Sequence, residues 1–215
     1  MWQLHGSELR RAIQDVNGDD MLSYLARNQK EVLHRVNHEN KSVMKAIQIR
    51  NEVVLIKLHI LDKELILSFP QLMNPSREVS KAVTDFVDEW FDLSRDLQPF
   101  YDLAYRDEIL KKVVLAYKGL RIIAVEELFE ALSWSIMGQQ ISLHVAYGLK
   151  QKLVTTYGES IVHDNIEYWL FPTAQQIASL TVEDLRKLSF TQRKAEYIIG
   201  VAKLIATGQL NKEQL

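Results

Sequence analysis

The first third of the chain alternates apolar and polar residues with the period of a β-strand. Between Val43 and Phe69 the apolar side chains form two runs of period two: Val54, Ile56, Leu58 and Ile60, then Leu65, Leu67 and Phe69. This spacing places side chains on one face of a strand. The polar pairs Asn51–Glu52 and Asp62–Lys63 separate the runs and can close antiparallel hairpins. The pattern predicts a small meander.

The residues ahead of the meander have helical spacing. Ser7 offers a capping hydroxyl, Asn17–Gly18 gives a stop signal, and four apolar residues recur between them: Leu9, Ala12, Ile13 and Val16. We therefore expect a helix between Ser7 and Gly18. A further strand is predicted from Val32 to Asn37.

Prolines and turn residues interrupt the strands near residue 70. After Pro70 and Asn74–Pro75–Ser76, apolar residues recur three and four apart in a helical stripe: Val79, Val83, Phe86, Val87, Trp90 and Phe91. The predicted fold class is α+β. We expect an N-terminal mixed α/β domain with a small antiparallel sheet at residues 1–73 and an all-helical domain at residues 74–215.

Helix signals continue to the end of the chain. Pro99 is expected to end the long helix or its successor, and a shorter stripe runs from Ile109 to Tyr117. Three threonines are placed to cap later helices: Thr173, which begins a capping box, Thr181 and Thr191. The last helix has its apolar residues on one face, and Gly208 provides a left-handed stop. No later segment alternates long enough to predict a strand.

Composition and charge narrow the class of protein. The 215 residues are 47% apolar, which is enough for one or two domains. No apolar run approaches the roughly twenty residues that span a bilayer, and the start lacks a secretory signal, so we expect no membrane partner and a cytoplasmic location. The absence of cysteine excludes disulfides and thiolate chemistry. The net charge of -2 does not indicate whether the protein binds DNA, because DNA binding needs only one basic face.

The common catalytic and metal motifs are missing from the sequence. Among the six histidines, only His34 and His38 are four residues apart, and they straddle an expected strand and turn instead of sharing a helix. The chain has no glycine-rich phosphate loop and no Gly-x-Ser-x-Gly elbow. We expect no metal ion and no other cofactor.

One segment, Trp134–Leu143, combines a helix stop with polar side chains. Gly138 stops an apolar helix, Ser142 can cap the next one, and Gln139–Gln140 lie at the tight corner between them. Glutamine both donates and accepts hydrogen bonds, so these amides can reach base edges. The alternative is a solvated loop whose amides bond to nearby backbone.

The stretch from Glu126 to Leu210 resembles the first part of the helical catalytic domain of the DNA-3-methyladenine glycosylase II branch of helix-hairpin-helix glycosylases. The matching residues occur in the family's order: Glu127–Glu130, Ile136–Ser142, Ala146, Leu153, Tyr157–Glu159, Phe171–Thr173, Leu185, Leu188, Arg193–Ile198, Ala202 and Gly208. Ordered agreement over this length makes the Gln–Gln corner a specific signal. A small mixed α/β domain ahead of the helices also fits this branch.

The resemblance implies an enzyme that flips an alkylated base, such as 3-methyladenine, out of double-stranded DNA and cuts its N-glycosidic bond. In this family the corner enters the minor groove and fills the vacated place. That wedge position falls on Gln140, with Gln139, Ile141 and Ser142 beside it; Gln139 and Ser142 can instead hold the corner's shape. Arg193 and Lys194 are candidate DNA-binding residues. We expect a monomer.

The same resemblance assigns no catalytic residue within this chain. The family's Gly-Ile-Gly-type turn and catalytic aspartate follow a helix equivalent to Arg193–Thr207, and we expect the chain to be C-terminally incomplete and inactive alone, with Asn211–Leu215 beginning a further helix. Asp184, Asp164 and Glu130 are expected to be surface or capping carboxylates.

Two alternative functions remain at this point. The chain can be a non-catalytic DNA-binding or scaffold module, with Arg186 and Lys187 adding to its basic residues. It can also be a protein-interaction module that uses the aromatic stripes at Trp90–Phe91 and Trp134.

Overall fold

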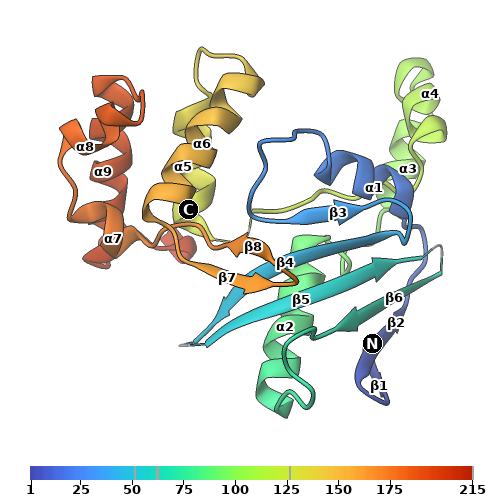
Figure 1. Ribbon diagram of the computed structural model, residues 1–215. Coiled ribbons are helices and arrows are strands. Elements are labelled where there is room, and N and C mark those ends of the chain that lie inside the picture. Colours follow the sequence, from blue (N-terminus) through green and yellow to red (C-terminus); the bar gives the residue numbers. More distant parts are fainter. Residues whose placement is uncertain (51, 62, 126, 215) are drawn as a thin grey trace. The chain divides into compact units, whose positions relative to one another are not determined.

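The computed structural model describes residues 1–50, 52–61, 63–125 and 127–214 (Figure 1). Contacts between residues group the chain into two compact units. The first unit comprises Met1–Arg27, Val36–Met44 and Ile49–Ala124, and the second comprises Asn28–Arg35, Lys45–Gln48 and Val125–Leu215.

Most residues of a six-stranded sheet belong to the first unit. Its strands are β1 (Gln3–His5), β2 (Glu8–Ala12), β3 (Arg35–Asn37), β4 (Ser42–Ile49), β5 (Glu52–Ile60) and β6 (Glu64–Ser68). They lie in the order β1-β2-β6-β5-β4-β3, and the pairs β1/β2, β2/β6 and β5/β6 are antiparallel. The predicted meander is confirmed as β4, β5 and β6. Asn51 and Asp62, one residue of each expected turn, lie outside the described residues.

The helix predicted between Ser7 and Gly18 is wrong. This segment forms β2, in which Leu9 stands opposite Leu67 of β6. Its five residues carry too few apolar positions to separate a period of two from one of 3.6, and pairing with β6 decides the outcome. The strand predicted from Val32 to Asn37 forms only over Arg35–Asn37.

Asn17 starts helix α1 (Gly18–Leu25) instead of stopping one. Its side chain accepts a hydrogen bond from the Asp20 amide at 3.1 Å, as an N-cap does. Gly18 is needed here for close approach, because a Cβ at this position would lie 2.8 Å from Cγ2 of Ile60. The Asn–Gly pair therefore marks the beginning of a helix packed against the end of β5.

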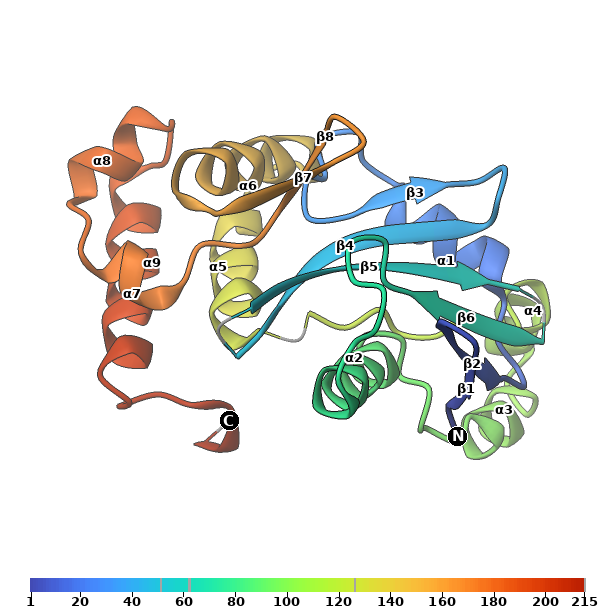
Figure 2. The same cartoon turned by 60° about the horizontal axis from the view of Figure 1, so that its bottom comes forward.

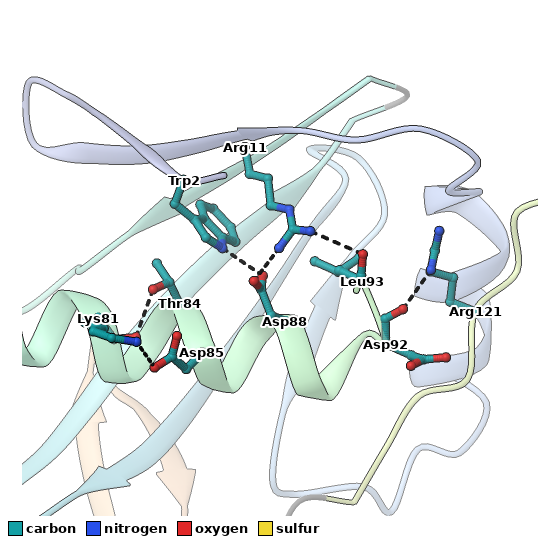
Figure 3. Close-up of polar contacts among 9 residues, drawn as sticks. All are labelled: Trp2, Arg11, Lys81, Thr84, Asp85, Asp88, Asp92, Leu93 and Arg121. Atoms are coloured by element: carbon teal, nitrogen blue, oxygen red, sulfur yellow. Dashed lines mark hydrogen bonds and ion pairs between the residues drawn. The ribbon is translucent and has the colours of Figure 1, made fainter. Parts of the chain in front are cut away.

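Helix α2 (Arg77–Trp90) lies against one face of the sheet and crosses the strand direction, with Ser76 as its N-cap (Figures 1 and 2). Figure 3 shows how Asp88 of α2 meets the N-terminal strands: it accepts a hydrogen bond from Trp2 Nε1 at 2.8 Å and pairs with the Arg11 guanidinium. Buried Arg121 donates to the carbonyl oxygens of Asp92 and Arg95 at 2.7 and 2.9 Å. These contacts tie the N-terminal segment to α2, and residue 121 to the loop that follows α2.

Two short helices complete the first unit. Pro99 stands in the first turn of α3 (Gln98–Ala104), where its missing N–H costs nothing, so it opens a helix and does not end one. Helix α4 (Glu108–Ala116) is N-capped by Asp107. Only Val114 of α4 is buried, and the predicted apolar stripe from Ile109 to Tyr117 is mostly exposed.

The described residues of the second unit form five α-helices. They are α5 (Leu128–Gly138), α6 (Leu143–Tyr157), α7 (Ala174–Ala178), α8 (Val182–Lys187) and α9 (Gln192–Ala206), with a 3-10 turn at Lys212–Gln214. Helix α9 packs against α5, α7 and α8 around one apolar cluster. The predicted caps Ser142, Thr173, Thr181 and Thr191 are confirmed, and both Thr173 and Thr181 form capping boxes.

The mixed α+β class is confirmed, but the expectation of an all-helical second part needs correction. Strands β7 (Ser160–His163) and β8 (Ile166–Trp169) form an antiparallel hairpin after α6. Asp164 and Asn165 make its turn with positive φ angles of 49° and 60°, which these residues tolerate. Four-residue strands are too short to give a readable alternation.

The domain boundary predicted between residues 73 and 74 falls between β6 and α2 and stays a prediction. The residues of α2, α3 and α4 belong to the first unit, which extends to Ala124. Glu126 and Leu215, the first residue of the family-like stretch and the last of the chain, lie outside the described residues. No described helix is long and apolar enough to cross a membrane.

Gly18→Ala is expected to destabilise the protein by about 1–3 kcal/mol, because the added methyl group would overlap Ile60. Gly200→Ala is the matched control. It also lies in a helix, but nothing lies within 4 Å of an added Cβ, so we expect a gain of about 0.5–1 kcal/mol. Urea unfolding of both variants measures the difference; equal effects would contradict the close approach.

Candidate nucleic-acid interface

The corner between α5 and α6 consists of four residues with different exposures. Helix α5 ends at Gly138, and α6 begins at Leu143 behind the N-cap Ser142, whose hydroxyl accepts from the Val145 amide at 3.4 Å. Gln139, Gln140 and Ser142 are exposed, whereas Ile141 is half-buried and packs against the apolar cluster. The corner is therefore held by Ile141 and Ser142 and presents two amide side chains outward.

Gln140 adopts a backbone conformation that is unusual for a residue with a side chain. Its φ is +57°, in the left-handed region, while the preceding Gln139 is extended at φ −62° and ψ 126°. Such a conformation costs about 1–3 kcal/mol in a residue other than glycine and persists only when surrounding contacts impose it. Strain of this kind gathers at functional sites, so it distinguishes Gln140 within the corner.

Lys194 supplies part of the restraint on the corner. Its ammonium group donates to the carbonyl oxygen of Met137 at 2.6 Å and to that of Gln139 at 2.9 Å. Charge-assisted hydrogen bonds contribute about 1.5–3 kcal/mol each, enough to offset the left-handed backbone next to them. Partial burial lowers the pKa of Lys194 below its ordinary value.

Arg193, the neighbouring residue in the first turn of α9, is placed differently. Its side chain is exposed, and it forms no ion pair or hydrogen bond within the described residues. Arg186 and Lys187 on α8 pair with Glu183 and Asp184, each at 3.1 Å. Arg193 and Lys194 therefore have different surroundings in the structure, although the sequence makes both of them candidate DNA-binding residues.

Away from the corner, a buried ion cluster joins α5, α6 and the segment before β3. The ammonium group of Lys150 lies 3.0 Å from Glu130 and 3.2 Å from Glu31, and 5.4 Å from the ring of Trp134. The Trp134 and Tyr147 rings pack 4.8 Å apart between the same two helices. One cation therefore connects three separate segments of the second unit.

The charges of this cluster shift one another's pKa values. Burial lowers the pKa of Lys150, but the adjacent Glu130 and Glu31 carboxylates raise it more, so it lies above 10.5. Burial raises the pKa of Glu31, but Lys150, then His34 and the Leu33 amide, lower it more, so it lies below 4.5. Both groups stay charged at neutral pH.

The three carboxylates weighed as catalytic candidates have other partners. Asp184 caps α8 through the Thr181 amide and hydroxyl and also bonds Lys187; these hydrogen bonds lower its pKa to about 2. Asp164 is exposed in the hairpin turn. The expectation that Glu130 is a surface or capping carboxylate is wrong, because its side chain is only 13% exposed and pairs with Lys150. Within the described ranges, no three His, Asp or Glu side chains gather to hold a metal ion.

Sequence reasoning missed the Lys150 cluster and the left-handed Gln140. A signal for Lys150 was present: it stands four residues after Ala146 and three before Leu153, both of which are buried. A lysine on such an apolar face needs a counter-charge. No sequence signal predicted the backbone of Gln140, because glutamine has no preference for positive φ.

Family comparisons match almost the entire chain. Residues 133–214 match the HhH-GPD superfamily of base excision DNA repair proteins, and residues 20–132 match the 8-oxoguanine DNA glycosylase N-terminal domain. The chain is 39% identical over 206 residues to a DNA-3-methyladenine glycosylase of Bacillus subtilis (strain 168), covering 94% of this chain and 66% of that protein. It is 32% identical over 101 residues to DNA-3-methyladenine glycosylase 2 of Escherichia coli (strain K12), covering 47% of this chain and 36% of that protein.

Solved structures show the same fold at lower sequence identity. A 3-methyladenine DNA-glycosylase from Archaeoglobus fulgidus aligns with a TM-score of 0.77 at 23% identity, covering 90% of this chain and 66% of that one. An MBOgg1 structure in complex with a low affinity DNA ligand aligns with a TM-score of 0.74 at 20% identity, covering 100% of this chain and 68% of that one. The chain thus spans about two thirds of the length of these structures.

Lys150→Met is expected to destabilise the protein by about 3–5 kcal/mol, because it leaves two buried carboxylates without a counter-charge. The triple variant with Glu31→Gln and Glu130→Gln removes those charges and should recover part of the loss. Urea unfolding measures both. A loss below about 1 kcal/mol for Lys150→Met would show that the cluster is not a buried ion network.

The cluster also predicts how stability depends on pH. Because its folded-state pKa is lowered, Glu31 stabilises the fold above pH 4.5, and this contribution disappears as the pH falls through the folded value. Lys150 stabilises fully below pH 10.5 and loses its contribution as the pH rises through its raised value. Unfolding free energies of wild type and Glu31→Gln should therefore converge in acid. A constant difference down to pH 2 would contradict this prediction.

Proposed function

Because the chain belongs to the DNA-3-methyladenine glycosylase II family of the HhH-GPD superfamily, we propose that it is the recognition part of a base excision repair glycosylase. The protein acts on double-stranded DNA with alkylated bases, flips the damaged nucleotide out of the stack and releases the base by hydrolysis of its N-glycosidic bond. It works as a monomer in the cytoplasm and needs no cofactor.

The observation that carries this proposal is the corner at Gln139–Ser142. Its two amides face outward, its apolar residue Ile141 is anchored in the core, and Gln140 is held in a left-handed backbone. A rigid projection of this kind suits insertion into a duplex, because little conformational entropy is lost on binding. The Gln140 amide is long enough to occupy the place of a flipped nucleotide and to hydrogen-bond the orphaned base.

Alkylated purines are already activated for release of the base, so a site with few specific contacts can process them. Methylation at a ring nitrogen places a positive charge on the base, which weakens the N-glycosidic bond and improves the leaving group. In hydrolysis, water adds its oxygen to C1′ of the sugar, the base leaves with the bond electrons, and a carboxylate accepts the proton from water. The cationic base can stack against aromatic rings.

Each of the three carboxylates considered as catalytic candidates has another place in the structure. Asp184 caps a helix, Glu130 is paired with Lys150, and Asp164 is in the hairpin turn. We therefore propose that residues 1–215 bind DNA but do not release the base by themselves. Base release by this chain would show that one of its own carboxylates performs the chemistry.

A binding experiment tests the proposed recognition. Fluorescence anisotropy should show that the chain prefers a duplex with an abasic site or an alkylated purine over an undamaged duplex. Gln140→Ala should reduce that preference about fivefold to tenfold, as expected for losing one buried hydrogen-bonded contact. Gln175→Ala, which removes an exposed amide of α7, is the matched control and should have no effect.

Each outcome of this experiment has a different meaning. Equal binding of all duplexes would favour a non-catalytic DNA-binding module, and no binding at low salt would favour a protein-interaction module. A duplex containing 8-oxoguanine belongs in the panel, because residues 20–132 match the 8-oxoguanine DNA glycosylase N-terminal domain. A preference for that duplex over the alkylated one would overturn the proposed substrate class.

A further inference from the structure

The two basic residues at the start of α9 have different surroundings. The guanidinium of Arg193 is exposed, and it has no ionic or hydrogen-bonding partner in the described part of the chain. The ammonium group of Lys194 is half-buried and bonds two carbonyl oxygens, those of Met137 at 2.6 Å and Gln139 at 2.9 Å. Arg193 is available to a ligand, whereas two of the three N–H donors of Lys194 are bonded to the protein.

The carbonyl groups that Lys194 binds belong to the end of α5 and to the corner itself. Carbonyl groups in the last turn of a helix lack partners along the helix and carry partial negative charge, so a cation is favoured there. Met137 lies in that last turn, and Gln139 is the C-cap. Lys194 therefore closes the end of α5 from a different helix.

The Gln139 carbonyl oxygen has a special position, because it belongs to the peptide group that joins Gln139 to Gln140. A peptide group is planar, so fixing the direction of this oxygen also fixes the plane from which φ of Gln140 is measured. Gln140 has φ +57°, a value that a side-chain-bearing residue adopts only under restraint. By fixing this peptide plane, the hydrogen bond from the Lys194 ammonium group to the Gln139 carbonyl oxygen restrains the backbone at Gln140.

We propose that Lys194 is a positioning residue that holds Gln140 in its left-handed conformation, and that Arg193, not Lys194, contacts DNA phosphate. This inference rests on the proposed function, because it assigns the corner a role in DNA. It divides two neighbouring basic residues into one that shapes the protein and one that binds the ligand.

DNA binding as a function of salt separates these roles. A lysine or arginine that neutralises one phosphate contributes about 0.9 to the slope of log K against log salt. Arg193→Met should lower this slope by about one and weaken binding of intact and abasic-site duplexes equally. Lys194→Met should leave the slope unchanged but reduce the preference for the abasic-site duplex about tenfold, and Lys194→Arg should recover part of it.

A second experiment needs no DNA. Lys194→Met should lower the unfolding temperature by about 3–6 °C, as expected for a domain of this size. In a Gln140→Gly background the loss should shrink by about 2–4 °C, because glycine adopts positive φ without restraint. Arg193→Met should cost the same small amount in both backgrounds and serves as the control.

The two experiments distinguish failure of this inference from failure of the proposed function. If the wild-type chain binds no duplex, the proposed function fails, while the thermal comparison still decides whether Lys194 holds Gln140. If Lys194→Met lowers the salt slope as Arg193→Met does, Lys194 contacts phosphate and the inference is wrong. Equal thermal losses in both Gln140 backgrounds would also overturn it.

Discussion

The ion contact of Lys150 with Glu130 and Glu31 is the interaction on which the paired helices α5 and α6 depend. A lysine as buried as this one is costly without counter-charges, and each glutamate would be costly without the lysine. Removing the lysine alone leaves two carboxylates without a counter-charge, which weakens the packing of the helices against the segment before β3. The corner joins these two helices, so the positions of its exposed glutamine amides depend on how the helices pack. The Trp134 and Tyr147 rings lie between the helices.

The corner itself shows how a short connection becomes a rigid projection. Ile141 anchors it in the apolar cluster, Ser142 caps α6, and Lys194 binds the carbonyl oxygens at the end of α5. With these groups turned toward the protein, the Gln139 and Gln140 amides remain for a partner. A projection arranged before binding loses less entropy on entering a duplex than a mobile loop would, which is why its internal contacts bear on the proposed function.

The relatives show that this fold is shared by proteins named for different lesions. The 3-methyladenine DNA-glycosylase from Archaeoglobus fulgidus aligns with the chain with a TM-score of 0.77, and residues 20–132 match the 8-oxoguanine DNA glycosylase N-terminal domain. A fold common to both names does not fix the damaged base, which is chosen by the groups that surround it once flipped. The 39% identity to the Bacillus subtilis protein is the ground for proposing alkylated bases.

The sequence alone determined the features that depend on neighbouring residues. The period of two from Val43 to Phe69, the caps Ser142, Thr173, Thr181 and Thr191, and the ordered family residues were enough to predict β4 to β6, most helices and the position of the corner. Tertiary structure decided what depends on distant partners. Pairing with β6 turned residues 8–12 into a strand, the Glu31–Lys150–Glu130 cluster joined residues 119 positions apart, and Lys194 reached the corner from 55 positions away. Local spacing can show which face of a helix is apolar, but it cannot show which remote charge or carbonyl group a lysine will meet, because that is set only when the helices pack.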